Sequence, residues 1–362
     1  MNNNYFWVGG CLLLLTACRI SSSIDPTEIQ LSSVQLSPND RTSAATQPLA
    51  QNQRRGITPQ FDSASDFAEG LALVSINNSY RYIHQTGKVA IAPEQEFSAM
   101  ATFSEGLAIV RLGSIYSCIN QTGQLLEQVQ FDSIAHFSEG LAAVKVNTKY
   151  GYINKSGQLV IQPKFALASP FSQGLAAVKV DRKYGYITPQ GQIAIAPSYD
   201  DAANFSQGLA AIRKGQQWGY INRSNQLIVH PQFDGAFPFA ESLARVRKGQ
   251  QWGYINQQGT LSIPLKFSFA NDFSEGLAAV QQHGKWGYIN PTGTIVIKSK
   301  FNYAAEFSQG LAAVQVNSKW GYINQSGDFA IAPKFDNAGS FSEGFARVQV
   351  GSKWGYISRD DV

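Results

Sequence analysis

Side chains that could catalyse a reaction or bind a metal are few in this sequence, and their spacing does not bring them together. The four histidines, His84, His136, His230 and His283, fall in four different phases of a chain that repeats every 34 residues. Stacked repeats would place them on different faces, whereas a metal site or a general base needs converging groups. We therefore expect surface or structural histidines.

The other reactive side chains also lack the partners that chemistry requires. A serine recurs in the motif Phe-Ser-Glu-Gly (Ser104, Ser138 and Ser274 among others) with no accompanying histidine, which favours a role in capping a turn. The acid of this motif alternates with Gln, whereas a calcium site in every repeat would need constant carboxylates. Cys118 is interpreted as a small buried filler. With no glycine-rich phosphate loop either, the sequence predicts no catalytic residue, metal, cofactor or nucleotide.

Composition excludes several classes of protein. Charged residues make up 15% of the 362 residues and aromatic residues 12%, with 32 glycines and a net charge of +4. Abundant aromatics argue against disorder, and aromatics together with glycine argue against a helical bundle. So small a positive charge is too weak for a nucleic-acid binder that neutralises phosphates. A β-rich, non-enzymatic protein is expected.

The first residues have the pattern of an export signal. Residues 6–17 form an uncharged apolar run, too short to span a bilayer but typical of a signal-peptide core. The Thr-Ala pair before Cys18 resembles the bacterial lipobox, whose cysteine receives a diacylglyceryl group and becomes the mature N-terminus. We predict a signal peptide over residues 1–17 and lipidation of Cys18. The alternative is an ordinary cleaved secretory peptide in which Cys18 has no role.

The segment after Cys18 is predicted to be a flexible linker. In residues 19–56, Ser, Thr, Gln, Asn and Pro dominate, and no period of 2 or 3.6 persists. A coil of this length spans roughly 30–40 Å on average, which would hold a folded domain clear of a membrane. Residues 359–362 are assigned to a C-terminal tail.

Three markers recur nine times in residues 57–358. Phe-Ser-Glu-Gly-Leu-Ala and its variants recur with a spacing of 36 once and 34 thereafter, and a Tyr or Trp follows each 13 residues later. A third aromatic closes a Pro-x-Phe segment. Three markers in one frame identify a tandem repeat array. The first marker begins at Phe67, Phe103, Phe137, Phe171, Phe205, Phe239, Phe273, Phe307 and Phe341.

Each repeat has the pattern of three short β-strands. Val and Ile recur at two-residue spacing, Gly interrupts about every ten residues, and Pro closes the third run. Gly157 and its equivalents stand where a hairpin needs a positive φ, and Asn225 replaces Gly there once. Ser242 replaces the glycine of Phe-Ser-Glu-Gly, so we interpret that position as requiring a small residue rather than a positive φ. The glycine after the Trp is predicted to allow a close approach by a neighbouring strand or ring.

Stacked repeats can bury their aromatic side chains against one another. One unit has no core of its own, whereas neighbouring units could align Trp218, Trp252, Trp286 and Trp320 in a continuous ladder. The alternative is that Trp and Tyr of adjacent units form stacking pockets for a glycan or a choline-like ligand. The residues assigned to one role or the other are Trp218, Trp252, Trp286, Trp320, Trp354, Tyr220, Tyr254, Tyr288 and Tyr322.

The two ends of the array complement each other. The last repeat stops at Ser358 without a third strand, and residues 57–61 supply a third-strand fragment before the first complete unit. Such an array can close into a ring, as in propellers whose termini share a blade, or can simply start and stop at a turn. We predict an all-β fold in which the nine repeats form an open superhelical or solenoid array, with a closed propeller-like ring as the alternative.

Lys-Trp-Gly-Tyr-Ile-Asn at residues 285–290 and 319–324, followed by Gly and by Ile-x-Pro-x-Phe, resembles the bacterial WG-containing (KWG) repeat. The resemblance covers about residues 57–358. It departs in the first four repeats, where Tyr replaces Trp, and at Gln217 and Gln251, which replace Lys. It implies a β-rich repeat domain, common on exported proteins, that interacts with partners and has no catalytic residues.

The function expected from these features is binding. We predict an exported, lipid-anchored bacterial protein that mediates protein–protein interaction in the cell envelope, with no nucleic-acid partner. The alternative is binding of a cell-wall polymer, glycan or choline-like ligand through aromatic pockets between repeats. Variable polar turns are expected to be exposed and to form a mildly cationic stripe. These turns are residues 147–149, 181–183, 214–216, 248–250, 283–285 and 317–319.

Overall fold

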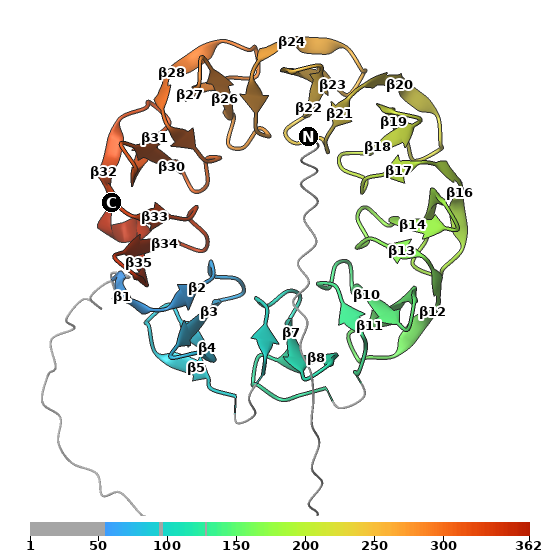
Figure 1. Cartoon of the computed structure of the whole chain (residues 1–362), viewed down its shortest axis with the longest axis horizontal. Helices are drawn as coiled ribbons and strands as arrows, with labels where there is room; N and C mark the ends of the chain where they lie inside the picture. Colours follow the sequence, from blue (N-terminus) through green and yellow to red (C-terminus); the bar gives the residue numbers. More distant parts are fainter. Residues whose placement is uncertain (1–54, 94–96, 127–128) are drawn as a thin grey trace, which may run out of the picture.

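A computed structural model describes residues 55–93, 97–126 and 129–362. The predicted signal peptide, Cys18 and residues 19–54 of the predicted linker lie outside the described residues. Nine β-sheets follow one another around a closed ring (Figure 1). Each sheet is a blade, and the blades are numbered 1 to 9 in the chain order of their innermost strands.

The ring is closed by strands from the two ends of the repeat region. Strand β1 (Ile57–Phe61) pairs antiparallel with β35 (Lys353–Ser358) and forms the outer strand of blade 9. The predicted open solenoid is therefore wrong, and its alternative, the closed ring, is the observed architecture. Closure is favoured because β1 covers the edge of β35 and buries two apolar side chains, Ile57 and Phe61, which keep 8% and 3% of their surface exposed.

The strands occupy four radial positions. The innermost are β2 (Ser63–Ala64), β6 (Ala99–Met100), β9 (Ser133–Ile134), β13 (Leu167–Ala168), β17 (Asp201–Ala202), β21 (Gly235–Ala236), β25 (Phe269–Ala270), β29 (Tyr303–Ala304) and β33 (Asn337–Ala338). The second are β3 (Leu71–Ile76), β7 (Leu107–Leu112), β10 (Leu141–Val146), β14 (Ala176–Val180), β18 (Leu209–Lys214), β22 (Leu243–Lys248), β26 (Ala278–Gln282), β30 (Leu311–Val316) and β34 (Phe345–Val350).

The third strands are β4 (Ser79–His84), β8 (Ile115–Asn120), β11 (Lys149–Asn154), β15 (Lys183–Ile187), β19 (Gln217–Asn222), β23 (Gln251–Asn256), β27 (Lys285–Ile289), β31 (Lys319–Asn324) and β35. The outermost are β5 (Val89–Ile91), β12 (Leu159–Phe165), β16 (Ile193–Tyr199), β20 (Leu227–Phe233), β24 (Leu261–Phe267), β28 (Ile295–Phe301), β32 (Phe329–Phe335) and β1. A short 3-10 helix, η1 (Arg359–Asp361), follows β35. Three strands per unit were predicted; the additional innermost strand has two residues, too few for a period to reveal.

Alternation along the strands gives each blade a face of large side chains and a face of small ones. In blade 7, Trp286, Tyr288 and Phe301 pack against Ala312 and Val314 of blade 8. Residues opposite each other in an antiparallel pair share a face, so the period of two sorts large from small. The apolar core is therefore distributed between neighbouring blades and does not lie at the centre of the ring.

The glycine after the aromatic marker lies where the outermost strand crosses the third strand. A Cβ on Gly321 would lie 2.4 Å from the carbonyl oxygen of Ile331 and 2.7 Å from the nitrogen of Pro333, so the predicted close approach is confirmed. Arg81 and Ser117 occupy this position in blades 1 and 2. Blade 1 has an outermost strand of only three residues, and the described part of blade 2 has isolated bridges in its place.

Two predictions about turns have different outcomes. Gly157, with a φ of 81°, and Asn225, with a φ of 62°, confirm the hairpin position that needs a left-handed residue. The interpretation of Ser242 is wrong, because its φ is 68° and the glycine at the same position in blade 7, Gly276, has a φ of 79°. A Cβ on Gly276 would meet nothing within 4 Å. Backbone conformation, and not size, constrains this position.

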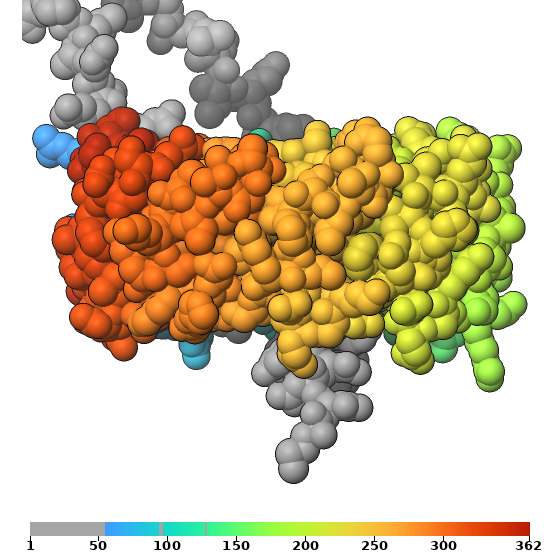
Figure 2. Space-filling model, turned by 90° about the horizontal axis from the view of Figure 1, so that it is seen from above, coloured from blue at the N-terminus to red at the C-terminus, as the bar shows by residue number. Residues whose placement is uncertain are grey.

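The outermost strands form the rim of the ring, seen edge-on in Figure 2 with neighbouring blades packed side by side. Proline interrupts most of these exposed edges, and a residue without an N–H cannot pair with a strand of another molecule. The third sequence marker therefore carries proline where it protects the rim. These prolines are Pro59, Pro163, Pro197, Pro231, Pro264 and Pro333.

Candidate functional site

The turns between the first and second strands point toward the centre of the ring (Figure 1), where they are linked by hydrogen bonds. The backbone N–H of Gly174 donates to the carboxylate of Glu139 in the preceding blade at 2.8 Å, and the N–H of Gly70 donates to Glu343 at 2.8 Å across the closure. Nine such bonds complete the circle. A carboxylate or an amide oxygen accepts equally well, which explains why Glu and Gln alternate here.

The recurring serine belongs to the same circle. The hydroxyl of Ser138 donates to the carbonyl of Phe171 in the next blade at 2.8 Å, and that of Ser342 donates to Phe67 at 2.8 Å. The serine was predicted to cap a turn; its hydroxyl bonds the carbonyl at the start of the equivalent turn in the next blade and so also joins two blades. The residue types of these turns are thus accounted for by bonds between blades, without a ligand.

The tyrosines that were candidates for ligand contact are buried. Tyr220, Tyr254, Tyr288 and Tyr322 are 0% exposed, and each hydroxyl donates to a carbonyl of the next blade, as from Tyr288 to Ala305 at 2.6 Å. Burial raises the pKa of these phenols well above the ordinary value. Cys118 takes this position in blade 2, where burial raises its pKa to about 12. These residues hold blades together.

The tryptophans form part of a ladder, but other rings separate them. Ring centroids lie 5.0 Å apart between Trp252 and Phe269, 5.6 Å between Phe269 and Trp286, and 5.6 Å between Trp286 and Tyr303. Contacts of 5.4 Å extend the row at both ends. We call this row, which runs through blades 6 to 8, the aromatic arc. Its members are Phe237, Trp252, Phe269, Trp286, Tyr303 and Trp320.

Alternate members of the aromatic arc are exposed. Phe269 and Tyr303 keep 40% and 43% of their surface exposed, whereas Trp252 and Trp286 keep 7% each. The predicted candidates Trp218 and Trp354 each stack with a cation, Arg213 at 5.8 Å and Arg347 at 5.5 Å respectively. The ladder thus packs neighbouring blades together and also forms an apolar strip on the surface of blades 6 to 8.

The polar turns expected to form a cationic stripe join the second and third strands and are exposed. Part of their charge is neutralised, because Lys183 and Lys319 pair with Asp200 and Asp336 at 2.5 Å. Both aspartates also accept a backbone N–H from such a turn, Asp200 from Gly215 at 2.8 Å. The aspartates that appear in only some repeats therefore have a structural use, and the stripe is weaker than its lysines suggest.

A groove of about 480 Å³ lies between blades 8 and 9. Tyr303, Gln315 and Trp320 form its wall on blade 8, where they stand opposite one another on adjacent strands. Gly339, Ser340 and Arg347 of blade 9 and Asp66 of blade 1 form the other side. Arg347 pairs with Asp66 at 3.0 Å, and partial burial raises the pKa of Asp66 despite this neighbour. The groove therefore combines two aromatic rings on one side with an ion pair on the other.

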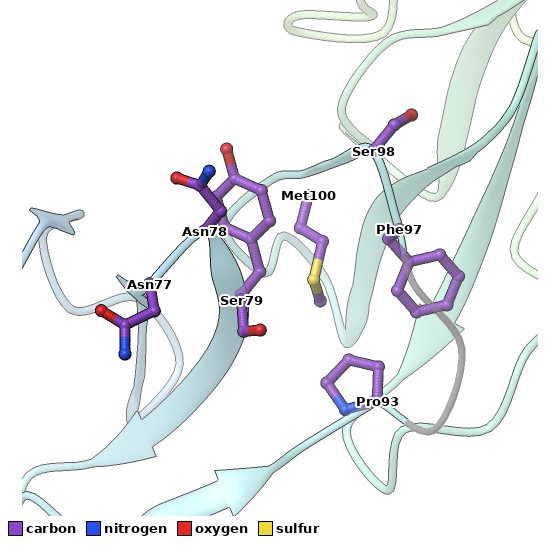
Figure 3. Close-up of a pocket in the computed structure, with 8 residues that line it drawn as sticks. Asn77, Asn78, Ser79, Pro93, Phe97, Ser98 and Met100 are labelled. Carbon is purple, nitrogen blue, oxygen red and sulfur yellow. The ribbon is translucent and has the colours of Figure 1, made fainter. Parts of the chain in front are cut away.

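A second pocket, of about 340 Å³, lies between blades 1 and 2 (Figure 3). Figure 3 shows Asn77, Asn78 and Ser79 on one side, Pro93 and Phe97 on the other, and Met100 between them. The pocket lies at the 36-residue spacing, next to residues 94–96, which are outside the described part of the chain. Its lining carries no charge.

The remaining reactive side chains stay apart. His84, His136, His230 and His283 lie in blades 1, 3, 5 and 7. In residues 55–93, 97–126 and 129–362, no three His, Cys, Asp or Glu side chains are placed to hold a metal ion. The same residues include no helix long and apolar enough to cross a membrane.

A ring of nine radial sheets, closed by both ends of the chain, defines a nine-bladed β-propeller. The chain belongs to the WG-containing repeat family, whose model matches nine consecutive segments. The matched segments are 56–80, 80–114, 116–150, 150–184, 184–218, 218–252, 252–286, 286–320 and 320–354.

One solved structure shows likeness of fold at low sequence identity, and two others match with lower TM-scores. A eukaryotic initiation factor matches at 11% identity and a TM-score of 0.59, over 82% of this chain and 90% of that one. The extracellular domain of the one-component system BT4673 from B. thetaiotaomicron matches at 11% identity and 0.34, over 83% and 53%. PorZ, a surface component of the type-IX secretion system of Porphyromonas gingivalis, matches at 6% identity and 0.35, over 84% and 52%. A comparison with curated proteins found no match.

Proposed function

We propose that this chain is a non-catalytic binding module, exported and anchored by a lipid on Cys18, that holds a second protein of the bacterial cell envelope against the aromatic arc. The observation that carries the proposal is the arc itself, an apolar strip in which Phe269 and Tyr303 are 40% and 43% exposed. Large rigid rings contribute contact area at low entropic cost, and such side chains dominate protein interfaces.

Comparison among the blades supports a role beyond packing. The position of Phe269 and Tyr303 is occupied by Ser133, Asp201 and Asn337 in three other blades, which pack on their neighbours without a ring there. Ring closure and blade stacking therefore do not require aromatic residues at this position. A strip restricted to adjacent blades is typical of a surface kept for a partner.

Export and anchoring are supported by the amino-acid sequence alone. The apolar run over residues 6–17 is followed by Cys18 with the lipobox pattern, and residues 19–56 form the predicted linker. Absence of catalysis is supported by the structural use of the recurring Ser, Glu and Tyr side chains, each bonded to a neighbouring blade.

Replacing Phe269 by serine is expected to reduce capture of the partner at least tenfold, because it removes the most central exposed ring of the arc. The measurement is recovery of detergent-solubilised envelope proteins on immobilised chain, quantified against unsubstituted chain. Leu167→Ser is the matched control, since Leu167 occupies the same position in blade 4 and is 42% exposed. It should leave recovery within twofold. Equal loss in both variants, or no specific protein recovered by the unsubstituted chain, would contradict the proposal.

A further inference from the structure

We propose that the groove between blades 8 and 9 binds a neutral saccharide. The inference does not depend on the protein contact proposed for the aromatic arc, although the last two rings of the arc, Tyr303 and Trp320, form one wall of the groove. It rests on three features of the groove: an interrupted row of rings, a partly exposed ion pair and a balanced charge.

The row of aromatic rings ends at Trp320 because no ring bridges Trp320 and Trp354, the tryptophan of blade 9. Tyr303 contacts Trp320 at 5.4 Å on one side. On the other side, Asn337 stands at the position of Phe269 and Tyr303, and Gly339 stands at the position of Phe237. The groove lies beside this interruption, where Tyr303, Trp320 and Gly339 line it. Trp320 packs in part against the core shared with blade 9 and also lines the groove, where a flat ligand can contact it.

The opposite side of the groove offers hydrogen-bond donors and acceptors together. Arg347 pairs through Nε with Asp66 at 3.0 Å and donates through Nη1 to the carbonyl of Ala64 at 2.9 Å. A guanidinium carries five N–H groups and a carboxylate accepts about four bonds, so both groups can bond a ligand without breaking the pair. Gln315 and Ser340 add an amide and a hydroxyl.

Blade 6 contains the same ion pair in a covered form. Arg245 stands at the position of Arg347, pairs with Asp272 at 2.8 Å and donates to the carbonyl of Ala270 at 2.9 Å. The ring of Phe237 lies over this guanidinium at 4.0 Å. In blade 6 the ion pair is thus packed under the ring of Phe237. Blade 9 has no ring at this position, so packing alone does not explain the ion pair there.

Trp354 lies over the Arg347 guanidinium at 5.5 Å, as Trp252 lies over Arg245 at 5.7 Å, but glycine leaves blade 9 without the second ring that covers the pair in blade 6. Gly339 replaces Phe237 at this position, and a Cβ there would already lie 2.9 Å from Cγ of Arg347 and 3.0 Å from Oδ1 of Asp66. The side chains of the pair thus fill the place next to the glycine and remain accessible, with Arg347 and Asp66 side chains 35% and 42% exposed.

The charge and shape of the groove select the class of ligand. Arg347 disfavours a choline-like cation, Asp66 disfavours an anion, and the two charges cancel, so a neutral ligand fits best. A saccharide ring has apolar C–H faces that can pack on Trp320 and hydroxyls that both donate and accept. The volume of about 480 Å³ lies within the range of small-ligand sites, roughly 300–1,000 Å³.

The test is titration of the full chain, labelled with ¹⁵N on its tryptophan indoles, with maltotriose, cellotriose and chitotriose. At least one trisaccharide is expected to shift the indole resonance of Trp320, assigned with Trp320→Ala, in a saturable manner. Gly339→Phe, which copies blade 6, should weaken that binding at least tenfold. Gln315→Ala, a milder change in the same wall, should weaken it at least threefold if Gly339→Phe fails to fold.

Phe269→Ser separates this inference from the proposed function, because it should reduce capture of the protein partner at least tenfold and leave trisaccharide binding within twofold. Gly339→Phe should do the reverse. No shift of the Trp320 resonance with any of the three sugars, or an undiminished shift in the folded groove variants, would overturn the assignment.

Discussion

Deletion of residues 57–61 is expected to leave the chain without a stable monomeric fold at 25 °C. These residues form β1, the outer strand of blade 9, and bury Phe61 and Ile57 against the last blade and the first. Truncating a buried Phe or Ile costs about 2–5 kcal/mol each, so loss of both approaches the whole stability of a typical domain, about 5–15 kcal/mol. Deletion also exposes the edge of β35, which favours aggregation.

The measurement is thermal unfolding combined with size-exclusion chromatography. A deletion of equal length over residues 45–49, outside the described residues, is the matched control and should leave both the unfolding midpoint and the monomer unchanged. A monomer lacking residues 57–61 that unfolds within 2 °C of the full chain would show that the strand is dispensable.

Gly321→Val is the substitution expected to destabilise the ring most through a single side chain. The new Cβ would lie 2.4 Å from the carbonyl oxygen of Ile331 and 2.9 Å from the carbonyl carbon of Ala332, and both are backbone atoms that cannot rotate away. Strand β32 must therefore move, at a cost of about 3 kcal/mol or more. The measurement is the free energy of unfolding from urea titration.

Gly276→Ser is the control for the loss of a glycine. Its φ of 79° is unfavourable for serine, but a Cβ there meets no atom within 4 Å, and Ser242 occupies the same position in blade 6. The expected cost is about 1 kcal/mol, that of a left-handed non-glycine residue. Equal destabilisation by the two substitutions would contradict the explanation of close approach at Gly321.

The repeat unit could be predicted from the sequence because its signals are local. These signals are the two-residue period of the strands, the hairpin glycines and the glycine after the aromatic marker, and each constrains a few adjacent residues. Gly157 and Asn225 have the positive φ expected of them, and Gly321 has the expected close approach. The family resemblance is likewise confirmed, because the family model matches along residues 56–354.

Closure could not be predicted in the same way, because it depends on the accumulated rotation between blades. The same strand fragment at residues 57–61 suits a ring or an array that starts at a turn, and no local pattern separates the two. The circle of bonds from Glu and Gln side chains to the next blade was equally hidden, since it joins residues 35 apart, as from Glu139 to Gly174.

The candidate surfaces were found only in part from the sequence. Trp218, Trp252, Trp286 and Trp320 stood out because they recur, whereas the bridging rings Phe269 and Tyr303 do not recur in every unit. Their signal was the opposite one, an aromatic residue at a position that is small or polar in most other repeats. Gly339 and Arg347 gave a similar signal, because both depart from the residue that is usual at their positions in the repeat. Such departures distinguish one repeat protein from another.

The groove between blades 8 and 9 requires the ring to be closed, because it includes Asp66 of blade 1 beside Arg347 of blade 9. The most direct measurement is the distance between spin labels on the exposed turns of blades 1 and 9, at Asn78 and Ser352. Cysteine is introduced at these positions with Cys11 and Cys18 replaced by serine, and Cys118 is buried. The reference pair is Ser318 and Ser352, in blades 8 and 9, which are neighbours in any arrangement.

The closed ring predicts the same distance distribution for both pairs, since each joins equivalent turns of adjacent blades. An open array would place Asn78 and Ser352 at opposite ends, so a distance several times that of the reference pair would contradict the account.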